Sequence, residues 1–121
     1  MADLRGALTA YGADYERTMA RFMGNESMYL RFLGMLFEDE NLAKLGDALA
    51  AGDRTAAFEA AHTLKGVAGN MGLTPLYDAV CAIVEPLRAQ DAGADYPALY
   101  AAVQAEFLRV AALRDGLERG E

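Results

Sequence analysis

Apolar residues recur at every third or fourth position along most of this chain, which is the spacing of one helix face. Long stretches lack the alternation of apolar and polar residues that is typical of a half-buried strand. β-branched residues are sparse, and the 121 residues include only 3 prolines. The apolar fraction of 54% consists largely of alanine, leucine and methionine, which are strong helix formers. These features predict an all-α fold.

Glycines, prolines and capping residues divide the chain into six predicted helices. Their expected ranges are 14–23, 27–39, 41–51, 54–71, 75–90 and 98–117. We expect Asp14, Ser27, Asp53 and Thr74 to cap helix starts, and Pro86 to kink or shorten the fifth helix.

Long amphipathic helices with short loops predict an antiparallel four-helix bundle, with short additional helices at the N-terminal side. We expect the four bundle helices to be those at 27–39, 54–71, 75–90 and 98–117. The short helix at 41–51 is expected to connect the first two of these.

At 13.0 kDa the chain has the size of one domain, and we expect a single domain over 1–121 with its core at about 14–117.

Cys81 is the only cysteine and cannot form an internal disulfide, so a reducing compartment is expected. The N-terminus lacks the apolar segment of a secretion signal, and no apolar stretch approaches the roughly 18 residues that span a membrane. We therefore expect a cytoplasmic, free-standing protein without a membrane partner. The net charge of −7 and the lack of a basic cluster argue against nucleic acid.

The most informative segment lies within the helix predicted at 54–71. On a helical wheel one face is apolar and predicted to be buried, and it consists of Ala57, Ala61, Leu64, Ala68 and Met71. His62, the only histidine of the chain, lies opposite the centre of this face. Lys65 and Gly66 flank His62 on the exposed face, and Gly69 lies two turns along it.

This spacing suits a histidine that reacts with a macromolecular partner. A neutral imidazole is a competent nucleophile near pH 7, and Lys65 would place a cation beside a phosphoryl group on His62. Glycines inside a helix cost about 1 kcal/mol each relative to alanine, but Gly66 and Gly69 would let a partner approach closely. An ordinary surface histidine with packing glycines explains each feature taken alone. The joint spacing favours phosphotransfer.

The segment resembles the signature of the histidine-containing phosphotransfer (HPt) domains of two-component phosphorelays. That signature is roughly His-x-Leu-Lys-Gly, five further residues, then Gly. It is matched here by His62, Leu64, Lys65, Gly66 and Gly72. The order of the predicted helices extends the resemblance over about 14–115.

The resemblance implies an antiparallel four-helix bundle with His62 exposed midway along one helix. His62 would accept a phosphoryl group from an aspartyl phosphate on a receiver domain, belonging to a response regulator or a hybrid histidine kinase, and pass it to another receiver. Lys65 would steady the phosphate and Gly66 would keep the approach open. The receiver would bind Mg²⁺, so this chain is expected to need no cofactor or metal and to act as a monomeric carrier rather than an enzyme.

A partner-binding face is expected around His62. Phe58 lies one turn before His62 and is predicted to touch the partner, as is Gly69. Glu59 lies three residues before His62 and is placed to hydrogen-bond the imidazole, with a simple surface charge as the alternative.

The helix at 27–39 is apolar nearly all round. We expect part of this surface to be covered by Met19, Phe22 and Met23, and the remainder to offer a docking patch or to join the core.

Three other functions fit the sequence less well. A non-transferring helical-bundle interaction module that binds a signalling partner is the main alternative, but His62, Lys65 and Gly66 occur together. A metal or haem bundle would use several inward Glu-x-x-His pairs, whereas Glu59 and His62 form the only such pair and point outward. An enzyme would need a pocket of convergent polar groups, and a histidine kinase would need a nucleotide-binding domain.

Overall fold

The computed structural model describes residues 3–118 of the chain, and this part contains seven helices and no strand. Four short helices come first: α1 (Leu4–Tyr11), α2 (Tyr15–Arg21), α3 (Glu26–Leu36) and α4 (Asn41–Ala50). Three longer helices follow: α5 (Arg54–Asn70), α6 (Thr74–Arg88) and α7 (Tyr96–Glu118). The all-α prediction is confirmed.

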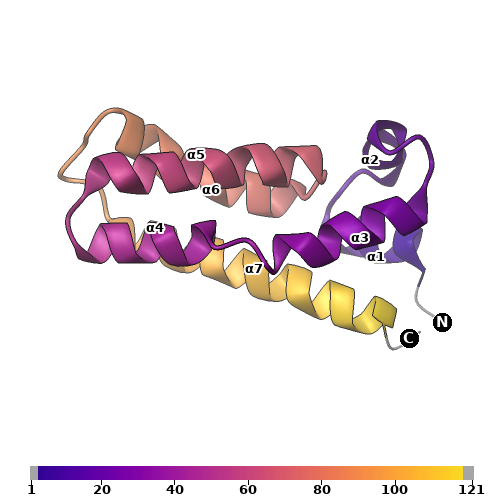
Figure 1. The fold of residues 1–121 in the computed structure, drawn as a ribbon. Coiled ribbons are helices and arrows are strands. Elements are labelled where there is room, and N and C mark those ends of the chain that lie inside the picture. The colour runs from indigo at the N-terminus through magenta and orange to yellow at the C-terminus, as the bar shows by residue number, and fades with distance from the viewer. Residues whose placement is uncertain (1–2, 119–121) are drawn as a thin grey trace.

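The longer helices lie side by side along the molecule (Figure 1). α5 packs against α6, α6 against α7, and α4 against both α5 and α7. α3 and α4 follow one another nearly in line, separated by a short turn (Figure 1). α4 connects α3 to α5 as expected, but it also packs along two long helices, which was not expected. α1 packs against α7 at the end of the molecule where α2 and α3 also lie.

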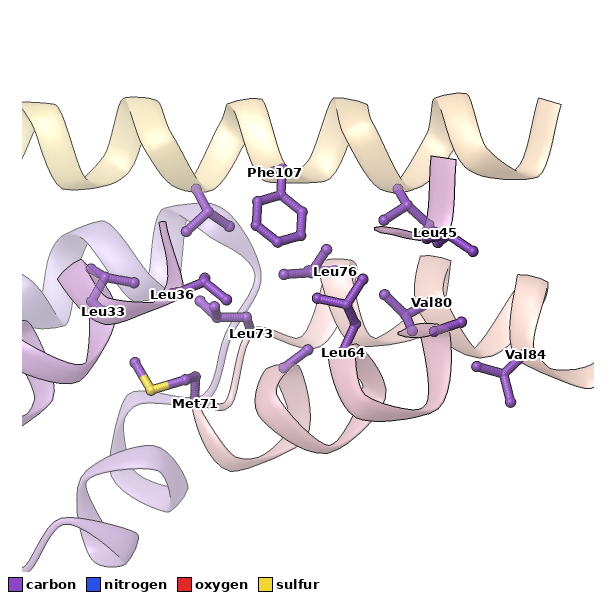
Figure 2. Packing of buried hydrophobic residues seen from close by; sticks show 14 of the residues in the cluster. Leu33, Leu36, Leu45, Leu64, Met71, Leu73, Leu76, Val80, Val84 and Phe107 are labelled. Carbon is purple, nitrogen blue, oxygen red and sulfur yellow. The ribbon is translucent and has the colours of Figure 1, made fainter. Parts of the chain in front are cut away.

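One cluster of buried apolar side chains joins the helices. Figure 2 shows Phe107 of α7 pointing toward Leu76 of α6 and Leu64 of α5. Leu36 of α3 and Leu73, between α5 and α6, belong to the same cluster. Burying a side chain of this size stabilises the fold by roughly 1.5–3 kcal/mol, so this cluster holds the helices in place.

Side-chain caps fix where several helices begin. Asp14 and Asp53 each accept a hydrogen bond from the backbone N–H three residues further on, as predicted. Asn25 does the same for α3, so the expectation that Ser27 caps this helix is wrong. Thr74 is the first residue of α6 rather than its cap, and α6 begins without a side-chain cap.

Two elements differ from the sequence prediction in extent. α1 was not predicted, although Leu4 and Leu8 bury one face of it and Asp3 caps its start. α6 continues two residues beyond Pro86 and ends at Arg88. Pro86 has no N–H to donate to the preceding turn, and only two helical residues follow it, so any distortion that it causes is confined to the end of α6.

Candidate functional site

His62 lies on the exposed side of α5, at the middle of the helix. The predicted buried face is confirmed, because each of its residues is at most 5% exposed: Ala57, Ala61, Leu64, Ala68 and Met71. This face packs into the core between α4 and α6. The imidazole therefore projects from a rigid, well-packed helix into a space that a partner can reach.

Phe58 lies beside the imidazole. The centroids of the Phe58 and His62 rings are 5.5 Å apart, and the ring planes meet at 35°. The guanidinium carbon of Arg88, from α6, lies 5.2 Å from the centroid of the Phe58 ring. Phe58 is half-buried and packs against the core, so its ring is held in place on the N-terminal side of His62. Its contact with a partner stays a prediction.

Gly66 and Lys65 lie on the C-terminal side of His62. A Cβ atom at Gly66 would meet no atom within 4 Å, so the space beside the imidazole is open there. Lys65 is half-buried and lines the same groove as His62. Its ammonium group forms no ion pair with any residue of the described part of the chain.

Two further glycines, Gly69 and the last motif residue Gly72, serve packing within the chain. A Cβ at Gly69 would lie 3.2 Å from Cε1 of Tyr77, and the Gly69 carbonyl accepts a hydrogen bond from Arg21. Gly72 has a φ of 67°, and a Cβ there would overlap the hydroxyl of Thr18. These glycines let α2 and α6 lie close to the end of α5. A partner contact at Gly69 stays a prediction.

Glu59 lies away from the groove of His62. Its exposed side chain lines a second groove, together with Lys44 and Asp47 of α4. Among the described residues, no hydrogen bond joins the Glu59 carboxylate to the imidazole, and the Glu59 backbone carbonyl accepts one from Thr63. The expected hydrogen bond to His62 is therefore not formed, while a partner contact at Glu59 stays a prediction.

His62, Lys65 and Gly66 line an open groove of about 690 Å³. Its facing side comes from α2 and includes Arg17 and Arg21. This contribution was not predicted, because only packing between segments far apart in the chain brings α2 to the groove. The spacing of Arg17 and Arg21 by four residues on one face of a short helix was the available signal.

Comparison with known families bears directly on this site. The sequence model of the Hpt domain matches residues 31–119, well over half of the 121 residues. The chain belongs to the Hpt domain family. Hpt domains act as phosphotransfer carriers in two-component phosphorelays, where they form phosphohistidine and interact with receiver domains. No match was found among curated proteins or among solved structures.

An apolar patch adjoins the groove of this Hpt domain. It includes Phe32 and Met35 of α3, which are 41% and 52% exposed. Phe22, the residue that follows α2, contacts Phe32 with ring centroids 5.8 Å apart, so it covers part of α3 as predicted. Met23 is 88% exposed, and the expectation that it helps to cover α3 is wrong. Asn70 lines both this patch and the groove of His62.

Residues 3–118 contain no group of three or more His, Cys, Asp or Glu side chains that could hold a metal ion. No helix within the same range is both long enough and apolar enough to cross a membrane.

Proposed function

We propose that this Hpt domain carries a phosphoryl group on His62 and relays it between receiver domains. A nitrogen of the imidazole attacks the phosphorus of an aspartyl phosphate, the bond from phosphorus to the aspartyl oxygen breaks, and the aspartate leaves as a carboxylate. In the second transfer the aspartate of another receiver attacks phosphorus and the bond to nitrogen breaks. The observation that carries this proposal is that His62 is exposed and lies beside Gly66, where an added Cβ would meet no atom within 4 Å.

Lys65 and Gly66 have distinct roles in this proposal. Lys65 lies one helical turn after His62 in the same groove, where its ammonium can offset the negative charge of a phosphoryl group. Gly66 leaves the space that the partner's backbone needs in order to bring its aspartate to the imidazole. The receiver binds the Mg²⁺ that the transfer requires.

The proposal includes the fold expected from the sequence, an antiparallel four-helix bundle in a single domain over 1–121. α3 and α4 together form one bundle helix, and α5, α6 and α7 form the other three. The contacts of α4 with α5 and α7, and of α6 with both of its neighbours, support this arrangement. The proposed carrier acts as a monomer in the cytoplasm, with which the lone Cys81 of the sequence agrees.

The proposed docking face for the receiver consists of Phe58 and the exposed apolar side chains of Phe32 and Met35. Large apolar side chains that are exposed next to a polar site are typical of protein interfaces. Glu59 and Gly69 remain predicted contacts at the edges of this face.

The test is phosphotransfer from a labelled receiver. The purified protein is mixed with a phosphorylated receiver domain and Mg²⁺ at neutral pH, beside a His62→Gln variant, and the label is followed on a gel. We expect label on the wild type that survives alkali and is lost in acid, and none on the variant. If no receiver from the source organism labels the wild type, the chain is instead a non-transferring interaction module.

A further inference from the structure

The groove beside His62 is basic, although the chain as a whole is acidic. The formal net charge is −7, yet three cations, Arg17, Arg21 and Lys65, line this groove. Asp14 is the only carboxylate among the described residues that line it. None of the three cations forms an ion pair with another residue in 3–118, so their charges are free to meet a ligand.

The opposite distribution holds in the second groove along α5, which faces α4. Among the described residues that line it, Lys44 is the only cation, and the carboxylates are Asp47, Asp53 and Glu59. α5 thus separates a basic groove that contains His62 from an acidic groove that does not. A basic surface confined to the side of the reactive residue favours an anionic partner on that side.

The basic groove is longer than a phosphoryl group needs. Lys65 lies one turn from His62, but Arg21 donates a hydrogen bond to the carbonyl of Gly69, seven residues further along α5. At 1.5 Å of rise per residue this carbonyl lies roughly 10 Å along the helix axis from His62. Arg21 cannot hold this bond and also contact a phosphoryl group on the imidazole. The cations of α2 are therefore placed to contact a part of a bound partner that lies beyond the phosphoryl group.

We propose that the basic groove binds an acidic segment of the receiver domain, and that Arg17 and Arg21 determine which receivers bind. The identity of this partner rests on the proposed function. Guanidinium groups donate paired hydrogen bonds to carboxylates, and unpaired surface cations speed the encounter with an acidic partner. α2 precedes residue 31, so both arginines lie outside the segment that the Hpt model matches.

A peptide titration tests the groove without any phosphotransfer. A peptide of six glutamates is added to isotopically labelled protein that carries His62→Gln, and backbone amide shifts are followed by NMR. We expect shifts concentrated around Arg17, Arg21 and Lys65, and their loss on Arg17→Glu/Arg21→Glu. The matched control is Lys44→Glu/Arg54→Glu, which changes the net charge equally outside the basic groove and should keep the shifts. Arg17→Gln alone should also weaken binding, and the Arg17 side chain forms no hydrogen bond with any residue between 3 and 118 that the fold would lose.

Two results of the titration would overturn the inference. One is a set of shifts spread evenly over the surface, or unchanged by Arg17→Glu/Arg21→Glu. The other is displacement of the peptide by inorganic phosphate at an equal concentration, which would make the groove a small-anion site. The titration needs no phosphotransfer, so its outcome is independent of the labelling experiment. If the peptide binds in the groove but no receiver labels the protein, the proposed function is refuted, while binding of acidic segments in the basic groove is still supported.

Transfer kinetics give the second readout. With a receiver that labels the wild type, Arg17→Glu/Arg21→Glu should raise KM about tenfold and leave kcat within about twofold, and the difference should shrink at high salt. If KM is unchanged and the half-life of phosphohistidine falls, the arginines act on the phosphoryl group and the inference is wrong.

Discussion

The ring of Phe58 lies 5.5 Å from the ring of His62, centroid to centroid, one helical turn before it on α5. Phe58 is in turn held by the core and by the guanidinium of Arg88 on the neighbouring helix α6. An exposed imidazole on a helix can adopt several rotamers, and each of its orientations presents the ring nitrogens differently. The contact with Phe58 reduces this freedom before any partner arrives.

Phe58→Ala should therefore slow phosphotransfer. An aromatic pair contributes about 0.5–1.5 kcal/mol beyond simple burial, which corresponds to a roughly two- to tenfold loss in rate if His62 must regain its orientation in each transfer. Initial rates from a phosphorylated receiver measure the effect, with Phe58→Leu as the control that keeps the bulk of the side chain. Equal rates for the wild type and a well-folded Phe58→Ala protein would show that Phe58 does not position the imidazole.

Gly66→Ala should separate stability from function. A Cβ at Gly66 meets no atom within 4 Å, so alanine should raise stability by up to about 1 kcal/mol through its higher helix propensity. The same methyl group would occupy the space beside His62 and should slow transfer by roughly tenfold or more. Thermal melts and transfer rates are compared with those of Gly116→Ala in α7, where a Cβ also meets nothing within 4 Å. The control should keep the wild-type rate, and a wild-type rate for Gly66→Ala would contradict the role of Gly66.

The central helix of the site could be predicted well from the sequence. The apolar spacing around His62 gave the buried face of α5, because one amphipathic helix fixes which of its own residues face the core. Asp53 also marked its start, because capping depends on residues only three positions apart. The sequence motif, supported by the family match over 31–119, gave the class of function.

What the sequence could not provide depends on contacts between distant segments. Gly69 was expected to leave room for a partner, but Tyr77 of α6 and Arg21 of α2 lie against it. The four-residue spacing of Arg17 and Arg21 places both on one face of α2, but it does not indicate that this face lies over the groove of His62. Their position follows from the path of α2 across the end of α5, where Thr18 packs against Gly72. α1 was missed for the same reason, since its partner is α7 at the other end of the chain.

Gly72→Ala should destabilise the protein by about 2–5 kcal/mol. The residue has a φ of 67°, which costs an L-residue roughly 1–2 kcal/mol, and its Cβ would overlap the buried hydroxyl of Thr18, which adds about 1–3 kcal/mol of overpacking. Gly24→Ala isolates the first contribution, because Gly24 has a φ of 75° and a Cβ there meets nothing within 4 Å. Urea unfolding of both variants measures the difference. If both variants lose the same free energy of unfolding, the Thr18 side chain moves aside without an energetic penalty. The close approach of α2 to α5 then does not depend on Gly72.

Tyr29 should make the protein sensitive to alkali. Its side chain is fully buried and its hydroxyl donates a hydrogen bond to the Met71 carbonyl at 2.8 Å, and burial raises the pKa of this phenol well above its ordinary value of 10.0. The pKa is higher in the folded protein than in the unfolded chain, so the folded state keeps its full stability below pH 10 and loses it as the pH rises further. The unfolding free energy should then fall by up to about 1.4 kcal/mol per pH unit for this one group.

Tyr29→Phe tests this dependence directly. At neutral pH the variant should be about 1 kcal/mol less stable, because the Met71 carbonyl loses its buried partner. Above pH 10 the difference from the wild type should shrink and then reverse, since phenylalanine has no proton to lose. Tyr11→Phe provides a second case, because burial and the hydrogen bond to Glu106 also raise the pKa of Tyr11. Parallel stability curves for the wild type and Tyr29→Phe between about pH 9 and 12 would show that Tyr29 ionises as easily in the folded protein as in the unfolded chain, and that the contact between α3 and the end of α5 opens before the phenol titrates.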